Sequence, residues 1–131
     1  MQNHSQDLWP EDIGSPIDLT APVNILKEQA ALLGDKTHNI VEAEVKTEFV
    51  DHDSALRHYF YLVAPALNHY RYRLFRIKHQ PTNFYPIEIT GAALKEPSII
   101  NSEDELREVL KNLFFSEQTR RIIQSLIAQS R

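Results

Sequence analysis

The 131-residue chain contains no cysteine and only three glycines. Without cysteine it has no disulfide framework, no thiolate zinc site and no cysteine nucleophile. With so little glycine it lacks the Gly-rich loops that hold phosphates and dinucleotides. A Gly-x-Ser-x-Gly motif is also missing, and none of the six histidines has a serine in a recognisable catalytic context. We therefore predict no catalytic residue and no cofactor, and an enzyme ranks behind the binding functions below.

Long apolar runs are missing as well. No apolar stretch approaches the roughly 20 residues that a membrane-spanning helix needs. The start, Met1 to His4, lacks the basic region and the apolar run of a signal peptide. We expect a cytoplasmic protein without a membrane partner. The length suffices for one domain with its own core.

Acidic residues are missing from the middle of the chain, although the net charge is −4 overall. Residues 1–53 carry eleven acids and three lysines, a net charge of −8, whereas residues 54–87 carry five cations and no acid. The same acid-free segment holds eight of the twelve aromatic residues. This segregation is the strongest functional signal in the sequence.

The N-terminal part divides into a tail and a helix. Residues 1–19 have no periodic apolar face and predict a mobile tail, so the single domain is expected to span residues 20–131. A helix is predicted after Thr20, because Pro22 suits a first helical turn and Gly34 suits a helix end. One helical face would carry Val23, Leu26, Ala30 and Leu33.

From Asn39 the apolar period changes to two, which predicts strands. Turn-forming residues at 51–54, 65–69 and 80–83 separate the apolar segments, and neighbouring strands usually pair. The sequence therefore predicts a four-stranded antiparallel meander with strands at 41–49, 56–64, 70–79 and 84–90. Residues 98–100 are a further candidate for a short edge strand.

Two helices are predicted at the C-terminus. Ser102 and Glu105 have the spacing of a capping box, and Ser116 can cap a second helix. Both helices have an apolar stripe. The order of helix, meander and helical pair predicts an α+β fold in which the helical pair packs on the sheet.

The strand at 69–79 is the first candidate binding surface. Its apolar face changes sides near Leu74 and Phe75, which predicts either a bulge or a strand that is covered differently along its length. Cations beside rings can neutralise phosphates and stack bases, so a small nucleic-acid-binding module is one hypothesis. Alternatively, these cations pair across strands with Glu42, Glu44 and Glu48, and the acidic net charge favours this reading. The candidate residues are Tyr70, Arg71, Tyr72, Arg73, Arg76 and Lys78.

Two short motifs contain metal-ligand residue types. Asp51, His52, Asp53 and His58 could ligate a metal if they converged, but the same residues are typical of a hairpin turn. Glu44-Val45-Lys46, with Asp35, is similar to the acid-x-lysine step of metal-dependent nucleases, a tripeptide that is common by chance. We favour the turn and predict no metal site.

The C-terminal helices are the second candidate surface. Phe114, Phe115, Ile123 and Ile127 belong to an apolar arc wider than one face of a small sheet would cover. Surplus apolar surface indicates a partner site, whereas a helical hairpin packed on itself and on the first helix is the alternative. We therefore predict a non-enzymatic protein-interaction domain, an adaptor or accessory subunit, that forms a homodimer. The nucleic-acid-binding module is the alternative function.

Overall fold

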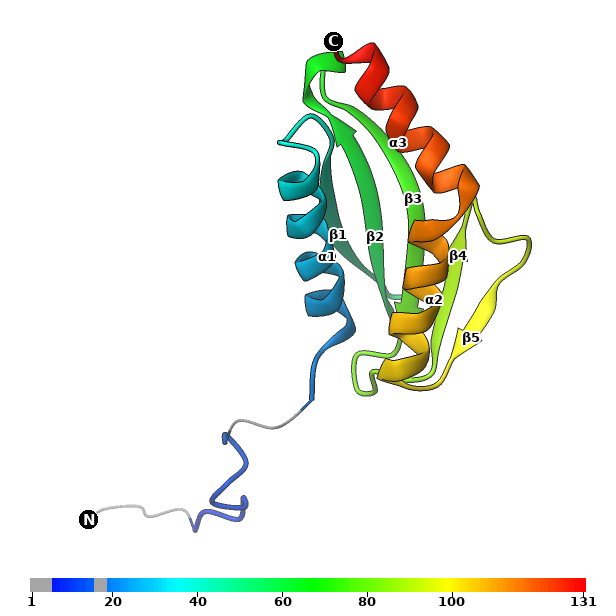
Figure 1. The fold of residues 1–131 in the computed structure, drawn as a ribbon. Helices are drawn as coiled ribbons and strands as arrows, with labels where there is room; N and C mark the ends of the chain where they lie inside the picture. Colours follow the sequence, from blue (N-terminus) through cyan, green and yellow to red (C-terminus); the bar gives the residue numbers. More distant parts are fainter. Residues whose placement is uncertain (1–5, 16–18) are drawn as a thin grey trace.

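A computed structural model of the chain describes residues 6–15 and 19–131. Within these residues a helix is followed by an antiparallel sheet of five strands and by two further helices (Figure 1). The predicted α+β class and the helix-sheet-helix order are confirmed. The predicted number of strands was one too small, because Ser98–Ile100 pairs with the sheet as a fifth strand.

Helix α1 spans Pro22–Lys36 and is two residues longer than the sequence predicts. Gly34 lies inside the helix and does not end it. The left-handed residues that end this helix are His38 and Asn39, with φ of 53° and 63°. The backbone N–H of Asn39 donates to the Gly34 carbonyl at 2.8 Å. Asparagine tolerates this conformation, so the chain turns without glycine at that position.

The five strands follow one another in the sheet in sequence order, and all pairs are antiparallel. The third strand has the predicted bounds, and the fourth begins three residues late, after Pro86. A short 3₁₀ turn, Pro65–Leu67, connects the second and third strands. The strands are β1 (Glu42–Val50), β2 (Ala55–Ala64), β3 (Tyr70–His79), β4 (Ile87–Gly91) and β5 (Ser98–Ile100).

The predicted bulge in β3 is confirmed. Phe75 pairs with Phe60 and Arg73 pairs with Tyr61, so Leu74 is the extra residue between them. Because of this extra residue, the consecutive side chains of Leu74 and Phe75 are both buried. The residues before and after the bulge therefore present apolar side chains to the same face of the sheet. On the other edge of β3, Gly91 lies so close that an added Cβ would be 2.8 Å from the Leu74 carbonyl oxygen.

The C-terminal helices are α2 (Glu103–Phe115) and α3 (Glu117–Gln129). The Ser102 hydroxyl accepts a hydrogen bond from the Glu105 N–H at 3.2 Å, as predicted. The Glu105 carboxylate accepts one from the Asn101 N–H at 2.7 Å, one residue before the position expected of a capping box. Ser116 ends α2 and caps α3 through the N–H of Thr119.

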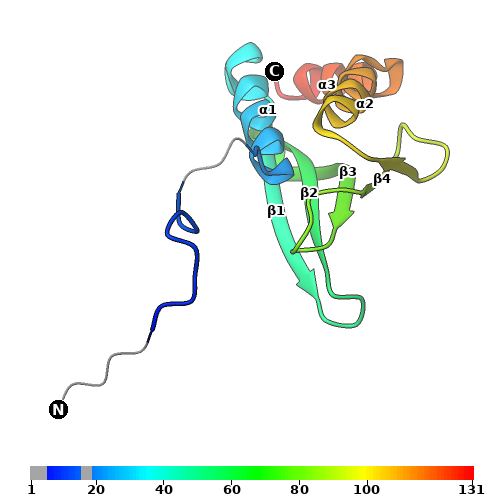
Figure 2. The ribbon, with the colours of Figure 1, turned by 90° about the horizontal axis from the view of Figure 1, so that it is seen from below.

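All three helices lie on one face of the sheet, so the molecule has two layers and the other sheet face is uncovered (Figure 2). The core fills the space between the layers and includes Leu26, Phe60, Phe75, Ile89 and Leu106. The far end of the β1–β2 hairpin extends past the helices, which explains why Phe49 is exposed despite its inward position. No helix in the described part of the chain is long and apolar enough to span a bilayer.

The predicted tail lies partly outside the described residues, which omit 1–5 and 16–18. The described part, residues 6–15, is exposed throughout and extends away from the N-terminal end of α1 (Figures 1 and 2). It contains a local turn in which the Ile13 N–H donates to the Pro10 carbonyl at 3.2 Å.

Candidate functional site

The uncovered sheet face, here called the open face, carries most of the charge that the sequence segregates. Side chains alternate between the two faces along each strand, so every second residue of β1 to β4 points to this face. These residues are Glu42, Glu44, Lys46 and Glu48 of β1, Arg57, Tyr59 and Tyr61 of β2, Arg71, Arg73, Arg76 and Lys78 of β3, on either side of the bulge, and Glu88 of β4. The Asp53 carboxylate joins them from the β1–β2 turn. Six cations therefore face five acids, and the local net charge is close to zero.

Ion pairs connect the open face across its strands. Arg71 pairs with Glu44 at 2.8 Å, which is one of the cross-strand partners considered from the sequence. Arg73 instead lies over the Tyr59 ring, 5.2 Å from its centroid, which is cation–π geometry. Of the two tyrosines on β3, Tyr70 is exposed and Tyr72 is half-buried on the helical side.

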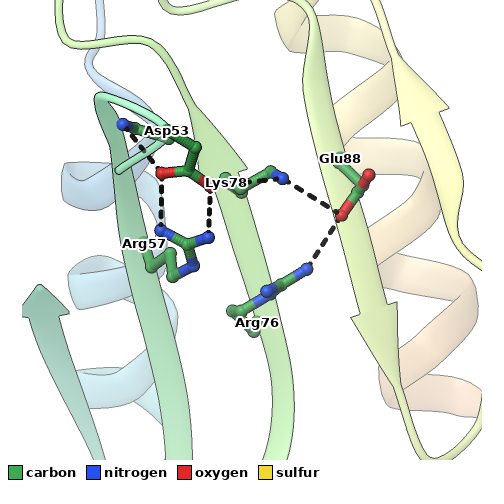
Figure 3. Close-up of polar contacts among 6 residues, drawn as sticks. Asp53, Arg57, Arg76, Lys78 and Glu88 are labelled. Carbon is green, nitrogen blue, oxygen red and sulfur yellow. Dashed lines mark hydrogen bonds and ion pairs between the residues drawn. The ribbon is translucent and has the colours of Figure 1, made fainter. Parts of the chain in front are cut away.

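A second group of ion pairs lies at the far end of the open face (Figure 3). The two terminal guanidinium nitrogens of Arg57 donate to the two oxygens of the Asp53 carboxylate. Lys78 lies between Asp53 and Glu88, 3.9 Å from each, and Arg76 donates to Glu88 at 2.8 Å. The bonds from Arg57 hold the pKa of Asp53 at about 2, well below its usual range. Arg76 and Lys78 are therefore paired with Glu88 and Asp53, and not with the β1 acids that the sequence suggested.

The two metal-ligand motifs are not brought together into sites. The Asp53 carboxylate accepts the Ala55 N–H at 3.3 Å, as turn residues do, while His58 points into the core. Glu44 is engaged by Arg71 and Lys46 on the open face, and Asp35 is exposed on α1. Across residues 6–15 and 19–131, no three histidine or carboxylate side chains converge.

The helical side of the molecule contains an apolar groove, here called the helical groove. Helix α1 forms one wall, the α2–α3 junction forms the other, and β2 and β3 form the floor. Its volume is about 280 Å³, close to the lower end of ligand pockets. The lining residues are Gln29, Leu32, Leu33 and Lys36 of α1, Phe60, Leu62 and Leu74 of the sheet, and Phe114, Phe115, Thr119 and Ile123 of the helical pair.

The apolar residues predicted on the C-terminal helices are divided between core and groove. Phe114 packs against the core rings of Phe60 and Phe75 with tilted ring planes, at centroid distances of 5.7 and 6.1 Å. Ile123 and Ile127 are half-buried against the core. Phe115 remains 72% exposed at the rim of the helical groove. The arc is therefore mostly intramolecular core, and Phe115 is its main uncovered residue.

Two histidines, His58 on β2 and His79 on β3, form a buried hydrogen-bonded pair. The Nε2 atoms of His58 and His79 are 3.1 Å apart. His79 Nδ1 lies 2.8 Å from the Gln80 carbonyl oxygen, which can only accept, so Nδ1 carries the proton and Nε2 accepts from His58. His58 Nδ1 then accepts from the Thr47 hydroxyl at 2.8 Å. Burial, together with smaller contributions from nearby His79 and Lys27, lowers the pKa of His58 to about 4.

Sequence reasoning missed the histidine pair and the α1 wall of the groove. Alternation along β2 and β3 places His58 in phase with Phe60, and His79 in phase with Ile77 and Phe75, so an inward pair could have been predicted. Leu32 directly precedes Leu33 in sequence but does not belong to the predicted apolar stripe of α1. No local pattern shows that it would border a groove.

Comparisons with protein-family models, with curated proteins and with solved structures find no match to this chain.

Proposed function

We propose that this chain is a non-enzymatic protein-interaction domain that self-associates through the helical groove. The observation that carries the proposal is the pair of large apolar side chains on the groove rim, Leu32 at 48% and Phe115 at 72% exposure. They border a floor of buried apolar side chains. Contiguous exposed apolar surface of this kind is typical of protein-interaction sites.

The chemistry of the groove supports a protein partner over a cofactor. Its polar lining residues are Gln29, Lys36 and the buried Thr119. A groove of this size accommodates one or two large side chains, which is how small interfaces are anchored. Because most cations of the open face are ion-paired, that face offers little field to a polyanion. We therefore rank the nucleic-acid-binding module second. A cytoplasmic adaptor or accessory subunit that forms a homodimer is the function proposed here.

Light scattering on the purified full-length chain tests self-association. We expect a dimer at tens of micromolar that dissociates on dilution, because one small groove per molecule gives a weak interface. Leu32→Ser combined with Phe115→Ser should yield a monomer. Ile99→Ser is the matched control, since Ile99 is 60% exposed on β5, where it lies opposite Glu88 of the open face. A parent chain that stays monomeric at these concentrations would contradict the proposal, as would an equal effect of the control.

A further inference from the structure

The N-terminal segment has the composition that the helical groove would bind. In residues 7–13, Leu8, Trp9 and Ile13 are large apolar side chains that are all exposed, with Trp9 at 72%. Exposed clusters of this kind in a soluble protein indicate a surface that another molecule covers. Local hydrogen bonds already hold the segment in a turn: the Trp9 N–H donates to the Asp7 carboxylate at 3.0 Å, and the Ile13 N–H donates to the Pro10 carbonyl.

The charges of segment and groove are complementary. The segment Asp7–Ile13 contains three acids and no cation. The groove is bordered by Lys36 on α1. Lys111 precedes Phe115 by four residues on α2 and therefore lies on the same side of that helix. Among the described residues, neither lysine forms an ion pair.

The direction of the segment favours a groove on another molecule. Residues 6–15 leave the domain at the N-terminal end of α1 and extend away from it (Figures 1 and 2). The groove lies along the C-terminal half of the same helix, from Gln29 to Lys36. The exposed side chains of Leu8, Trp9 and Ile13 show that the segment does not occupy its own groove, which leaves it available to a neighbouring one.

We infer that the helical groove binds residues Asp7–Ile13 of a second copy of this chain, with Trp9 inserted between Leu32 and Phe115. The inference rests on the proposed function and names the segment that fills the groove. A two-fold exchange would fill both grooves of a dimer, since each molecule carries one segment and one groove. Lys36 and Lys111 would lie beside the acids of the bound segment.

Trp9 reports on its own environment, because it is the chain's only tryptophan. We expect its fluorescence emission to lie at shorter wavelength in the dimer and to shift to longer wavelength on dilution. Full-length Leu32→Ser/Phe115→Ser keeps the segment but loses the groove, so its emission should stay at long wavelength at every concentration. Both substituted residues are substantially exposed, and circular dichroism checks that the variant is folded.

A mixing experiment identifies the molecule that supplies the groove. Full-length Trp9→Ser has an intact groove and no tryptophan. Adding it in excess to the Leu32→Ser/Phe115→Ser chain should restore the short-wavelength emission, because the first chain supplies the groove and the second the tryptophan. Ile99→Ser with Trp9 present should behave as the parent.

Three other outcomes would contradict the inference or the proposed function. If the parent dimerises through the groove while Trp9 emission stays at long wavelength, the inference is wrong and the proposed function stands. Short-wavelength emission that persists in a dilute monomer would place the segment in its own groove and would also overturn it. A chain that remains monomeric would overturn the proposed function itself.

Discussion

The buried histidine pair should make the stability of this protein fall as the pH is lowered through the range from 6.5 to about 4. His58 has a pKa of about 4 in the folded chain, against an ordinary value of 6.5. Between these values the unfolded chain binds the proton and the folded chain does not. Stability therefore rises with pH in this window, is complete above 6.5 and is lost as the pH falls toward 4.

The size of the effect follows from the same interval. At about 1.4 kcal/mol for each pH unit, the interval between 6.5 and 4 corresponds to a loss of about 3 kcal/mol in the free energy of unfolding. Such a loss is a large share of the 5–15 kcal/mol, roughly, that stabilises a domain. The low pKa of Asp53 affects stability only at lower pH. Its contribution to the free energy of unfolding is lost as the pH falls from the ordinary carboxyl pKa of 3.8 to about 2.

The assay is urea unfolding followed by circular dichroism at several pH values between 7 and 4.5, with His58→Gln compared with the parent. Gln keeps a polar side chain beside Thr47 and His79 but does not titrate. We expect the variant to be less stable at pH 7 and to show a flatter dependence of unfolding free energy on pH. His69→Asn is the matched control, because His69 is exposed and has a φ of 56° that Asn tolerates. An unchanged pH slope in His58→Gln would refute this account of the pair.

Three further predictions concern other parts of the chain. A truncation that starts at Thr20 should keep the thermal midpoint within about 5 °C of the parent when both are measured dilute enough to be monomers. A loss of less than about 1 kcal/mol in the free energy of unfolding shifts the midpoint by no more than that. A larger drop would show that the tail is structural. Anisotropy titration with a mixed single-stranded oligonucleotide should show no binding tighter than about 10 μM at physiological salt, because the open face is nearly neutral. Submicromolar binding that is lost on Arg71→Ala with Arg73→Ala would instead favour the nucleic-acid-binding module. Gly91→Ala should destabilise by about 1–3 kcal/mol in chemical unfolding, because its Cβ would meet the Leu74 carbonyl at the bulge; Gly14→Ala, with nothing nearby, is the control and should be neutral.

Much of the fold could be predicted because its signals are local. The capping box at Ser102, the helix cap at Ser116 and the period-two pattern of the strands depend on residues close in sequence. The bulge at Leu74 was one of two interpretations of the change of apolar face within the strand, and the register of β3 against β2 decides in its favour. The end of α1 was wrongly placed at Gly34 because the left-handed residues that end the helix are His38 and Asn39. The strand count was one too small because the candidate edge strand at residues 98–100 was not included in it. Residues 98–100 form a strand only because β4 offers an unpaired edge.

The sequence by itself determined the elements, the two-layer class and the residues that carry charge on β3. Only the tertiary structure decided which charges meet: Lys78 lies between Asp53 and Glu88, whose positions depend on the hairpin turn and on strand pairing. It also decided that Phe114 enters the core while Phe115 does not. The helical groove exists because α1 and the α2–α3 junction form its two walls on the same sheet face, with Phe60, Leu62 and Leu74 of the sheet between them. Periodicity shows which side of a helix is apolar, but the distance between two helices depends on every side chain packed beneath them.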